Sequence, residues 1–225
     1  MTKAKFRLSP TTGLSLFKEC PRCFWLHYNK NVHRPRGIFP SLPGGMDLVI
    51  KDYFDKYRGK LPPDIEGKVE GQLVADLKLL NKWRDWRTGL EYYDQERDAV
   101  LFGALDDCLA KDALYIPLDY KTRGFPVKEG DSEKYYQTQL DAYSLLLSEN
   151  GYPVKDFAYL IYYYPKEVKE NGVVDFNVKP IKINTDLKRA KKTFEDAVDF
   201  LKGAIPKEHS DCEYCPWVND RLGFE

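Results

Sequence analysis

Two C-x-x-C pairs stand at opposite ends of this chain, and they constrain its fold more than any other feature. Cys20 and Cys23 form the first pair, and Cys212 and Cys215 form the second. Because most of the chain lies between the pairs, they cannot build a compact zinc ribbon from local sequence. In a reducing compartment, two such pairs indicate a four-thiolate metal site more often than disulfides. We therefore expect a metal site that joins the N- and C-terminal segments.

Composition and charge favour a cytoplasmic globular protein. Of the 225 residues, 43% are hydrophobic, which is enough to bury one core, so we expect a single domain over residues 1–225. There is no apolar run of about 20 residues and no apolar leader, which predicts no membrane association. The net charge is zero, yet residues 1–46 carry eight Lys and Arg against one acid. That basic stretch suits phosphate-backbone binding and an ordinary solvated surface about equally.

Two predicted strands flank a short turn and carry the candidate chemistry, at residues 101–110 and 115–122. If the chain reverses at residues 112–113, Asp106 faces Asp119, with Cβ atoms roughly 5 Å apart. Lys121 lies two residues beyond Asp119 and therefore projects from the same face. Two unscreened carboxylates would repel, so the arrangement favours a divalent cation between them. The alternative is a solvated ion pair, which contributes only about 0–1 kcal/mol.

Periodicity and turn signals predict the other elements. Helices are expected at residues 12–28, 45–58, 72–80, 132–150 and 187–201, and strands at 90–93, 99–110, 157–164 and 173–183. Ser132 is the expected cap of its helix, and Gly151 is the expected left-handed stop. This order predicts an α/β fold with a mixed β-sheet core flanked by helices.

Three ordered motifs point to a family: G-x-x-D at Gly103 to Asp106, D-x-K at Asp119 to Lys121, and Q-x-x-x-Y at Gln139 to Tyr143. In this order they resemble the PD-(D/E)XK nuclease superfamily, most closely its RecB-type branch and the related CRISPR-associated adaptation nucleases. The resemblance implies a restriction-endonuclease-like fold and Mg²⁺- or Mn²⁺-dependent hydrolysis of DNA phosphodiester bonds.

The resemblance also implies an iron-sulfur cluster, of the 4Fe-4S type, at the cysteines. The common family pattern has one early and three late cysteines, whereas this chain has two and two. Four thiolates suit a structural Zn²⁺ equally well, so zinc remains the alternative. Cys108 lies within a predicted strand, where we expect a small buried side chain.

The resemblance assigns roles to the residues of the hairpin. Asp106 and Asp119 would bind the divalent cation, and the backbone carbonyl of Tyr120 would be a further oxygen ligand. Lys121 would orient or help deprotonate the attacking water and stabilise the transition state. The alternative for Lys121 is simple charge balance.

Three further residues are candidates for the same site. Gln139 and Tyr143 are four residues apart and share one helical face, and the resemblance implies that they point toward the active site to contact substrate or Lys121. The alternative for Tyr143 is a buried tyrosine whose hydroxyl is satisfied. Asp47 stands where related nucleases often carry a histidine ligand in a G-x-x-H segment. It could bind a hard cation, or it could be a first-turn acid favoured by the helix dipole.

The predicted function is a DNA nuclease, more an end-processing exonuclease than a sequence-specific cutter, in DNA repair, recombination or defence. No G-x-x-x-x-G-K phosphate loop is present, so any helicase or other nuclease-complex subunit would be a separate partner. The alternative is a catalytically inactive nucleic-acid-binding module that keeps the fold and a structural zinc or iron-sulfur site. DNA rather than RNA follows from the resemblance alone.

Overall fold

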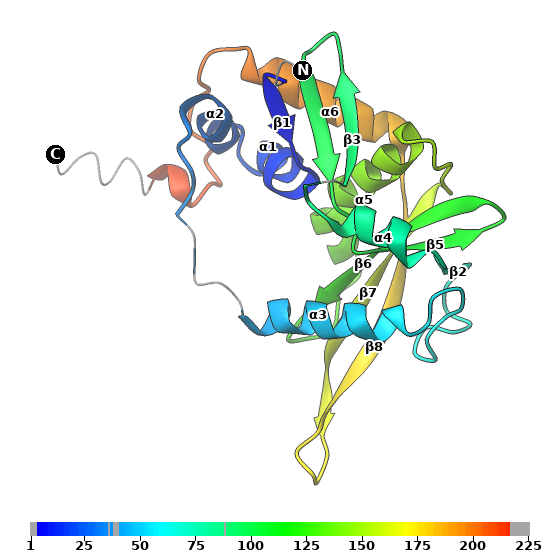
Figure 1. Ribbon diagram of the computed structural model, residues 1–225. Helices are drawn as coiled ribbons and strands as arrows, with labels where there is room; N and C mark the ends of the chain where they lie inside the picture. Colours follow the sequence, from blue (N-terminus) through cyan, green and yellow to red (C-terminus); the bar gives the residue numbers. More distant parts are fainter. Residues whose placement is uncertain (1–3, 36, 38–40, 88, 217–225) are drawn as a thin grey trace.

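The computed structural model describes residues 4–35, 37, 41–87 and 89–216, and it has the predicted mixed α/β architecture. Two mixed sheets are flanked by helices, where the sequence predicted one sheet (Figure 1). The three-stranded sheet has the order β1 (Phe6–Leu8), β4 (Ala99–Gly103), β3 (Leu90–Asp94). The five-stranded sheet has the order β2 (Gln72–Leu73), β5 (Asp107–Lys111), β6 (Leu114–Thr122), β7 (Phe157–Val168), β8 (Val174–Asn184).

The predicted strand at 99–110 is two strands in different sheets, β4 and β5. β4 pairs with β1 and β3, whereas β5 pairs with β2 and β6, so the chain leaves one sheet and enters the other between Gly103 and Asp107. The three-residue strand β1 was not predicted. It pairs in parallel with β4 and makes the small sheet mixed.

The amino-terminal helix is broken where the cysteines begin. The predicted helix at 12–28 is a π-helical turn (Pro10–Ser15), α1 (Leu16–Glu19) and α2 (Pro21–Lys30). Cys20 between them is extended, with φ −153° and ψ 100°, because a residue that precedes proline is disfavoured in the helical conformation. Cys20 thereby becomes the N-cap of α2, and its sulfur accepts from the backbone N–H of Cys23 at 3.4 Å.

The other helices lie near their predicted positions, with three corrections. They are α3 (Ser41–Asp55), α4 (Leu77–Arg84), α5 (Asp131–Glu149) and α6 (Leu187–Leu201). The predicted helix at 72–80 is strand β2 followed by α4, which Asp76 caps through the N–H groups of its first turn. α3 begins at Ser41, before the predicted start at residue 45. The N-cap of α5 is Gly130, not Ser132, whose hydroxyl instead lies 3.0 Å from the Tyr162 hydroxyl in the core.

The five-stranded sheet is covered on both faces. One face packs on α3 through a cluster that includes Ile50, Phe54, Leu109, Ile116, Leu118 and Tyr120. The other face and the small sheet pack on α5 and α6 through a larger cluster that includes Leu140, Leu146, Phe194 and Val198. Along β6 alternate residues face opposite layers. Because Leu118 and Tyr120 face α3, Asp119 and Lys121 face α5.

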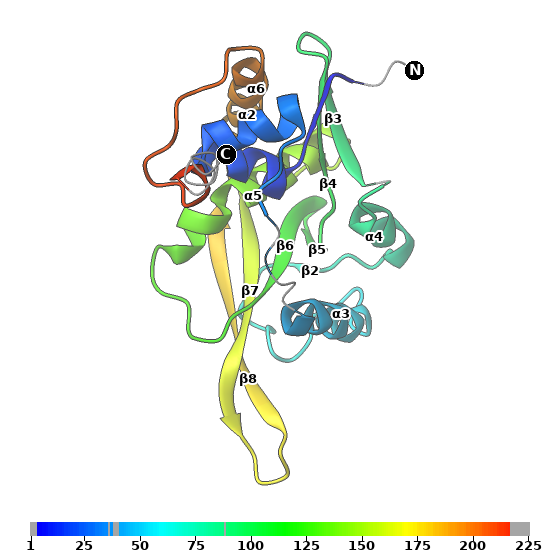
Figure 2. The same ribbon diagram turned by 90° about the vertical axis from the view of Figure 1, so that its left-hand side faces the viewer.

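Strands β7 and β8 form a long hairpin that extends beyond the rest of the fold (Figure 2). Their pairing continues to Val168 and Val174, with an irregularity between Pro165 and Glu167. Within the described part of the chain, no helix combines the length and the apolar character that a membrane crossing requires.

Candidate functional site

The hairpin β5–β6 has the predicted register. Asp107 pairs with Leu118 and Lys111 with Leu114, and the chain reverses at residues 112–113, which both have positive φ. Asp106 lies one residue before β5, so the same register places it beside Asp119. The backbone N–H of Tyr120 is 3.4 Å from Asp106 Oδ2. The two carboxylates therefore lie together at the junction between the sheets.

Asp119 is the buried centre of this site, with 1% of its side chain exposed. Gln139 Nε2 donates to Asp119 Oδ1 at 2.9 Å and is 2.8 Å from the Tyr143 hydroxyl. Asp119 Oδ2 pairs with the Lys121 ammonium but accepts no well-directed hydrogen bond. Burial and, in smaller part, the neighbouring Asp106 raise the pKa of Asp119 to about 7, although Lys121 opposes the shift.

Lys121 is held as a cation between the sheet and α5. Burial acts to lower its pKa, but the adjacent Asp119 and Asp106 outweigh burial, so the pKa of Lys121 is raised. Its Nζ also lies 4.7 Å from the centre of the Tyr136 ring, on the same helix as Gln139. The structure thus brings together five of the predicted residues: Asp106, Asp119, Lys121, Gln139 and Tyr143.

Asp47 is linked to the site by Lys51, a residue that the sequence prediction missed. Lys51 lies four residues after Asp47 on α3, and its Nζ is 2.7 Å from Asp47 Oδ2 and 2.8 Å from Asp106 Oδ1. Burial acts to lower the pKa of Lys51, but Asp106 and Asp47 outweigh burial and raise it. The Asp–Lys spacing of four residues on one helix was the available signal.

A second acidic group behind the site was also missed. Asp107 is fully buried on the α3 face, where Arg58 donates two hydrogen bonds to it, at 2.7 and 2.6 Å. Arg84 Nη2 adds a third contact at 3.2 Å, and the Tyr120 hydroxyl donates to Asp107 Oδ2 at 2.5 Å. Arg84 Nε also donates to the backbone carbonyl of Asp106 at 2.7 Å. This network holds the start of β5 in place.

Gly103 allows α5 to approach the site closely. A Cβ at this position would lie 2.8 Å from Leu146 Cδ1 and 3.4 Å from Tyr143 Cε1. A larger residue at the G-x-x-D glycine would therefore require the Leu146 side chain, and by a smaller amount the Tyr143 ring, to move.

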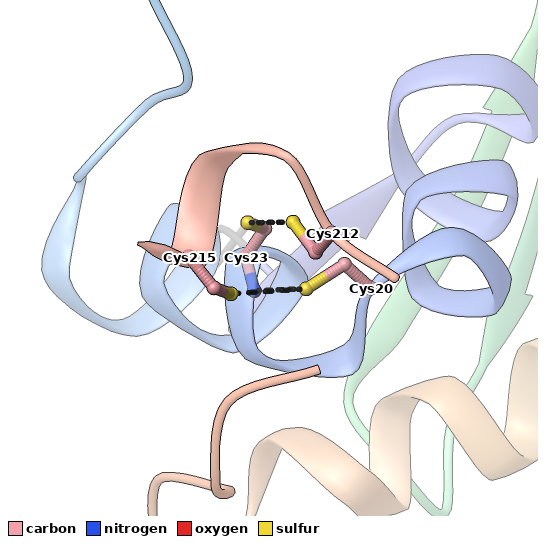
Figure 3. A group of neighbouring side chains, drawn as sticks. All are labelled: Cys20, Cys23, Cys212 and Cys215. Atoms are coloured by element: carbon pink, nitrogen blue, oxygen red, sulfur yellow. Dashed lines mark hydrogen bonds between the residues drawn. The ribbon is translucent and has the colours of Figure 1, made fainter. Parts of the chain in front are cut away.

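The four cysteines at the two ends of the chain form one cluster (Figure 3). Their sulfurs all lie within 4.8 Å of one another, with Cys20 Sγ 3.7 Å from Cys215 Sγ and Cys23 Sγ 3.6 Å from Cys212 Sγ. The N- and C-terminal segments are thus joined as predicted. Cys108 lies apart in β5 and is fully buried.

One basic side chain contacts the cysteine cluster. Arg34 Nη2 donates to Cys212 Sγ at 3.4 Å, and its Nη1 pairs with Glu19. Donors to sulfur stabilise a metal-bound thiolate. Within the described ranges, this is the one set of three or more His, Cys, Asp or Glu side chains whose ligand atoms gather so closely. Asp47, Asp106 and Asp119 do not form such a set.

The hairpin carboxylates nevertheless fit a hard divalent cation. Asp119 Oδ2 pairs with the Lys121 ammonium but accepts no well-directed hydrogen bond, and Asp106 beside it keeps 25% of its side chain exposed. Carboxylate oxygens are the ligands that Mg²⁺ and Mn²⁺ prefer.

Comparison with known proteins identifies a family that this chain matches. The model of the family described as "PD-(D/E)XK nuclease superfamily" matches residues 65–219. The matched residues include the β5–β6 hairpin, α5 and the second C-x-x-C pair, whereas α3 and the first pair precede them. No curated protein matches the chain.

One solved structure, titled "Crystal structure of SSO0001", is similar at 20% sequence identity and a TM-score of 0.32. The match covers 53% of this chain and 49% of that chain, so it spans about half the length of each. A likeness this weak carries no argument about fold or function.

Proposed function

The chain belongs to the PD-(D/E)XK nuclease superfamily, and from that premise we propose that it is a Mg²⁺- or Mn²⁺-dependent deoxyribonuclease that hydrolyses phosphodiester bonds. The observation that carries the proposal is the buried Asp119, which lies beside Asp106 and is contacted by both Lys121 and Gln139. A buried carboxylate with a raised pKa and a specific cationic partner is typical of a functional site.

In this proposal Asp106 and Asp119 hold the divalent cation, with the backbone carbonyl of Tyr120 as a further candidate ligand. A bound Mg²⁺ or Mn²⁺ would acidify a water molecule and offset negative charge on the scissile phosphate. Asp47 is a weaker candidate for the ligand set, since it contacts Asp106 only through Lys51. The raised pKa of Asp119 means that a proton competes with the cation near neutral pH.

Lys121 supplies positive charge at the reaction centre. The adjacent Asp119 and Asp106 favour its charged form and raise its pKa, and as an ammonium it would orient the attacking water and stabilise negative charge. Gln139 fixes the orientation of the Asp119 carboxylate, and the Tyr143 hydroxyl in turn fixes the Gln139 carboxamide. Both residues therefore serve mainly to position Asp119.

The proposed substrate is DNA, and the proposed role is end processing in repair, recombination or defence, with any helicase on a separate subunit. These finer assignments come from the family. Comparing linear DNA with closed circular DNA of the same sequence tests the exonuclease assignment, because an exonuclease requires an end.

The test of the site itself is cleavage of labelled single-stranded and duplex DNA with Mg²⁺ or Mn²⁺. Asp119→Ala is expected to abolish cleavage, because the variant loses a cation ligand and the partner of Lys121. Asp196→Ala is the matched control, since Asp196 is an exposed aspartate on α6 that pairs with Lys192. Cleavage by Asp119→Ala at the wild-type rate would reject the proposed site. A wild-type protein that binds DNA but cleaves none would be the inactive binding module.

For the cysteine cluster, the sulfur spacing supports a single tetrahedral ion, Zn²⁺, over the iron-sulfur cluster that the family resemblance implied. A Zn–S distance of about 2.3 Å places sulfurs at tetrahedral corners about 3.8 Å apart. Two of the sulfur pairs, at 3.7 and 3.6 Å, agree with that spacing, and all four sulfurs lie within 4.8 Å of one another. A cluster of several irons bridged by sulfide holds its cysteine sulfurs farther apart than one ion does.

Metal analysis of protein purified without oxygen tests this assignment. We expect one zinc per chain, a colourless solution and no acid-labile sulfide. Cys212→Ser is expected to lose the zinc, and Cys108→Ala, which alters a buried cysteine outside the cluster, to retain it. Stoichiometric iron and sulfide with broad visible absorbance would contradict the zinc assignment and restore the iron-sulfur prediction.

A further inference from the structure

A second lysine lies among the carboxylates of the candidate site, and neither a motif nor the family match assigns it a role. Lys51 projects from α3 with its Nζ between Asp47 Oδ2 and Asp106 Oδ1, at 2.7 and 2.8 Å. Its side chain is 23% exposed. Because α3 packs against the opposite face of the sheet from α5, Lys51 approaches Asp106 from the side away from Gln139.

The charges of the site are already nearly balanced without a metal ion. Three carboxylates, Asp47, Asp106 and Asp119, face two ammonium groups, Lys51 and Lys121. Lys51 contacts Asp106 Oδ1, whereas the Tyr120 amide lies near Asp106 Oδ2. A divalent cation bound to Asp106 must therefore either displace Lys51 from this oxygen or lie close to the Lys51 ammonium. The second arrangement is unfavourable, because two positive charges a few ångströms apart repel strongly.

Lys51 is the ammonium that is free to leave. Lys121 is paired with an almost fully buried carboxylate and lies over the Tyr136 ring. The partners of Lys51, Asp47 and Asp106, are 37% and 25% exposed, whereas the partner of Lys121 is 1% exposed, so the Lys51 amine has the more direct route to solvent along its flexible stem. Asp47, one helical turn away, can keep the released ammonium close by.

We propose that Lys51 is an internal counter-ion that a divalent cation displaces from Asp106, so that this lysine sets the metal affinity of the site. The inference rests on the proposed function, because it requires a cation at Asp106 and Asp119. It gives Asp47 a role as the partner that retains Lys51, rather than as a metal ligand.

Binding of Mn²⁺ in the absence of DNA tests the inference, with free Mn²⁺ measured by electron paramagnetic resonance. Lys51→Met removes the charge and keeps the stem, and it is expected to bind Mn²⁺ about tenfold or more tightly than wild type. Lys51→Arg keeps the charge and should bind Mn²⁺ at about the wild-type affinity. Lys192→Met is the matched control, since it removes the ammonium of another Lys–Asp pair with a spacing of four residues, remote on α6.

Thermal melting provides a second readout that also reports whether the variants fold. Without Mn²⁺, Lys51→Met leaves Asp106 without its ammonium partner and should melt at a lower temperature than wild type. Saturating Mn²⁺ should raise the melting temperature of this variant more than that of wild type, because tighter binding stabilises the folded state more.

The outcomes separate this inference from the proposed function. If Asp119→Ala abolishes Mn²⁺ binding but Lys51→Met binds no tighter than wild type, Lys51 is only a structural ion pair and the inference fails alone. If wild type and Asp119→Ala bind Mn²⁺ equally, or if neither binds it, the cation site itself is wrong and both proposals fail.

Discussion

Asp107→Ala is expected to lower the free energy of unfolding by about 3–5 kcal/mol, the usual cost of removing one partner from a buried ion pair. The carboxylate is fully buried, and its loss leaves the Arg58 and Arg84 guanidinium groups without their shared acceptor. The Tyr120 hydroxyl loses its acceptor as well. Urea unfolding followed by circular dichroism measures the change.

The neighbouring aspartate provides the matched control for this prediction. Asp106 and Asp107 are adjacent, but they project to opposite faces of the sheet. Asp106→Asn is expected to change the free energy of unfolding by less than about 1 kcal/mol, since Asp106 is partly exposed, and to abolish DNA cleavage. If the two variants were destabilised equally, the division between a structural and a functional aspartate would be wrong.

Removing the metal from the cysteine cluster is expected to free the C-terminal segment and to cost several kcal/mol of stability. Binding of a structural Zn²⁺ contributes about 10–16 kcal/mol in zinc-finger peptides. Here the hydrophobic core remains, so the loss should be smaller and local. Residues 204–216 contain little regular structure, and besides the cluster they contact the rest of the chain through the hydrogen bond from Arg22 to the Pro206 carbonyl at 2.9 Å and the stacking of Arg34 on the Tyr214 ring.

Limited proteolysis of wild type, Cys20→Ser and Cys108→Ala measures this effect. The chelated wild type and Cys20→Ser are expected to be cleaved rapidly within residues 204–216, whereas Cys108→Ala should resist as the untreated wild type does. Cys108 is a matched control because it is a buried cysteine outside the cluster. Equal resistance in metal-free and metal-bound protein would show that the cluster does not hold this segment.

The register of the β5–β6 hairpin could be predicted because a two-residue turn fixes it locally. Once the chain reverses at residues 112–113, the pairing of every following residue is set, and this places Asp119 beside Asp106. The shared helical face of Gln139 and Tyr143 follows from their spacing in the same way. The meeting of the two C-x-x-C pairs could be predicted because two such pairs are typical of a four-thiolate metal site.

The division of residues 99–110 between two sheets could not be predicted in this way. The segment is apolar almost throughout, and only the positions of β1, β3, β2 and β6 decide which half pairs with which sheet. Strand β2 could not be predicted either, because it is defined by its pairing with β5. The start of α4 had a local signal, since Asp76 is the N-cap of that helix. Short strands have too little local preference to be identified without their partners.

The sequence alone determined the α/β class, the hairpin register that places Asp106 beside Asp119, and the four-cysteine cluster, because each depends on short-range spacing or on the chemistry of one residue type. Only the tertiary structure placed Lys51 against Asp106 and buried Asp107 among Arg58 and Arg84. These contacts join elements far apart in the chain, and the geometry of a charged side chain depends on the packing of the layers around it.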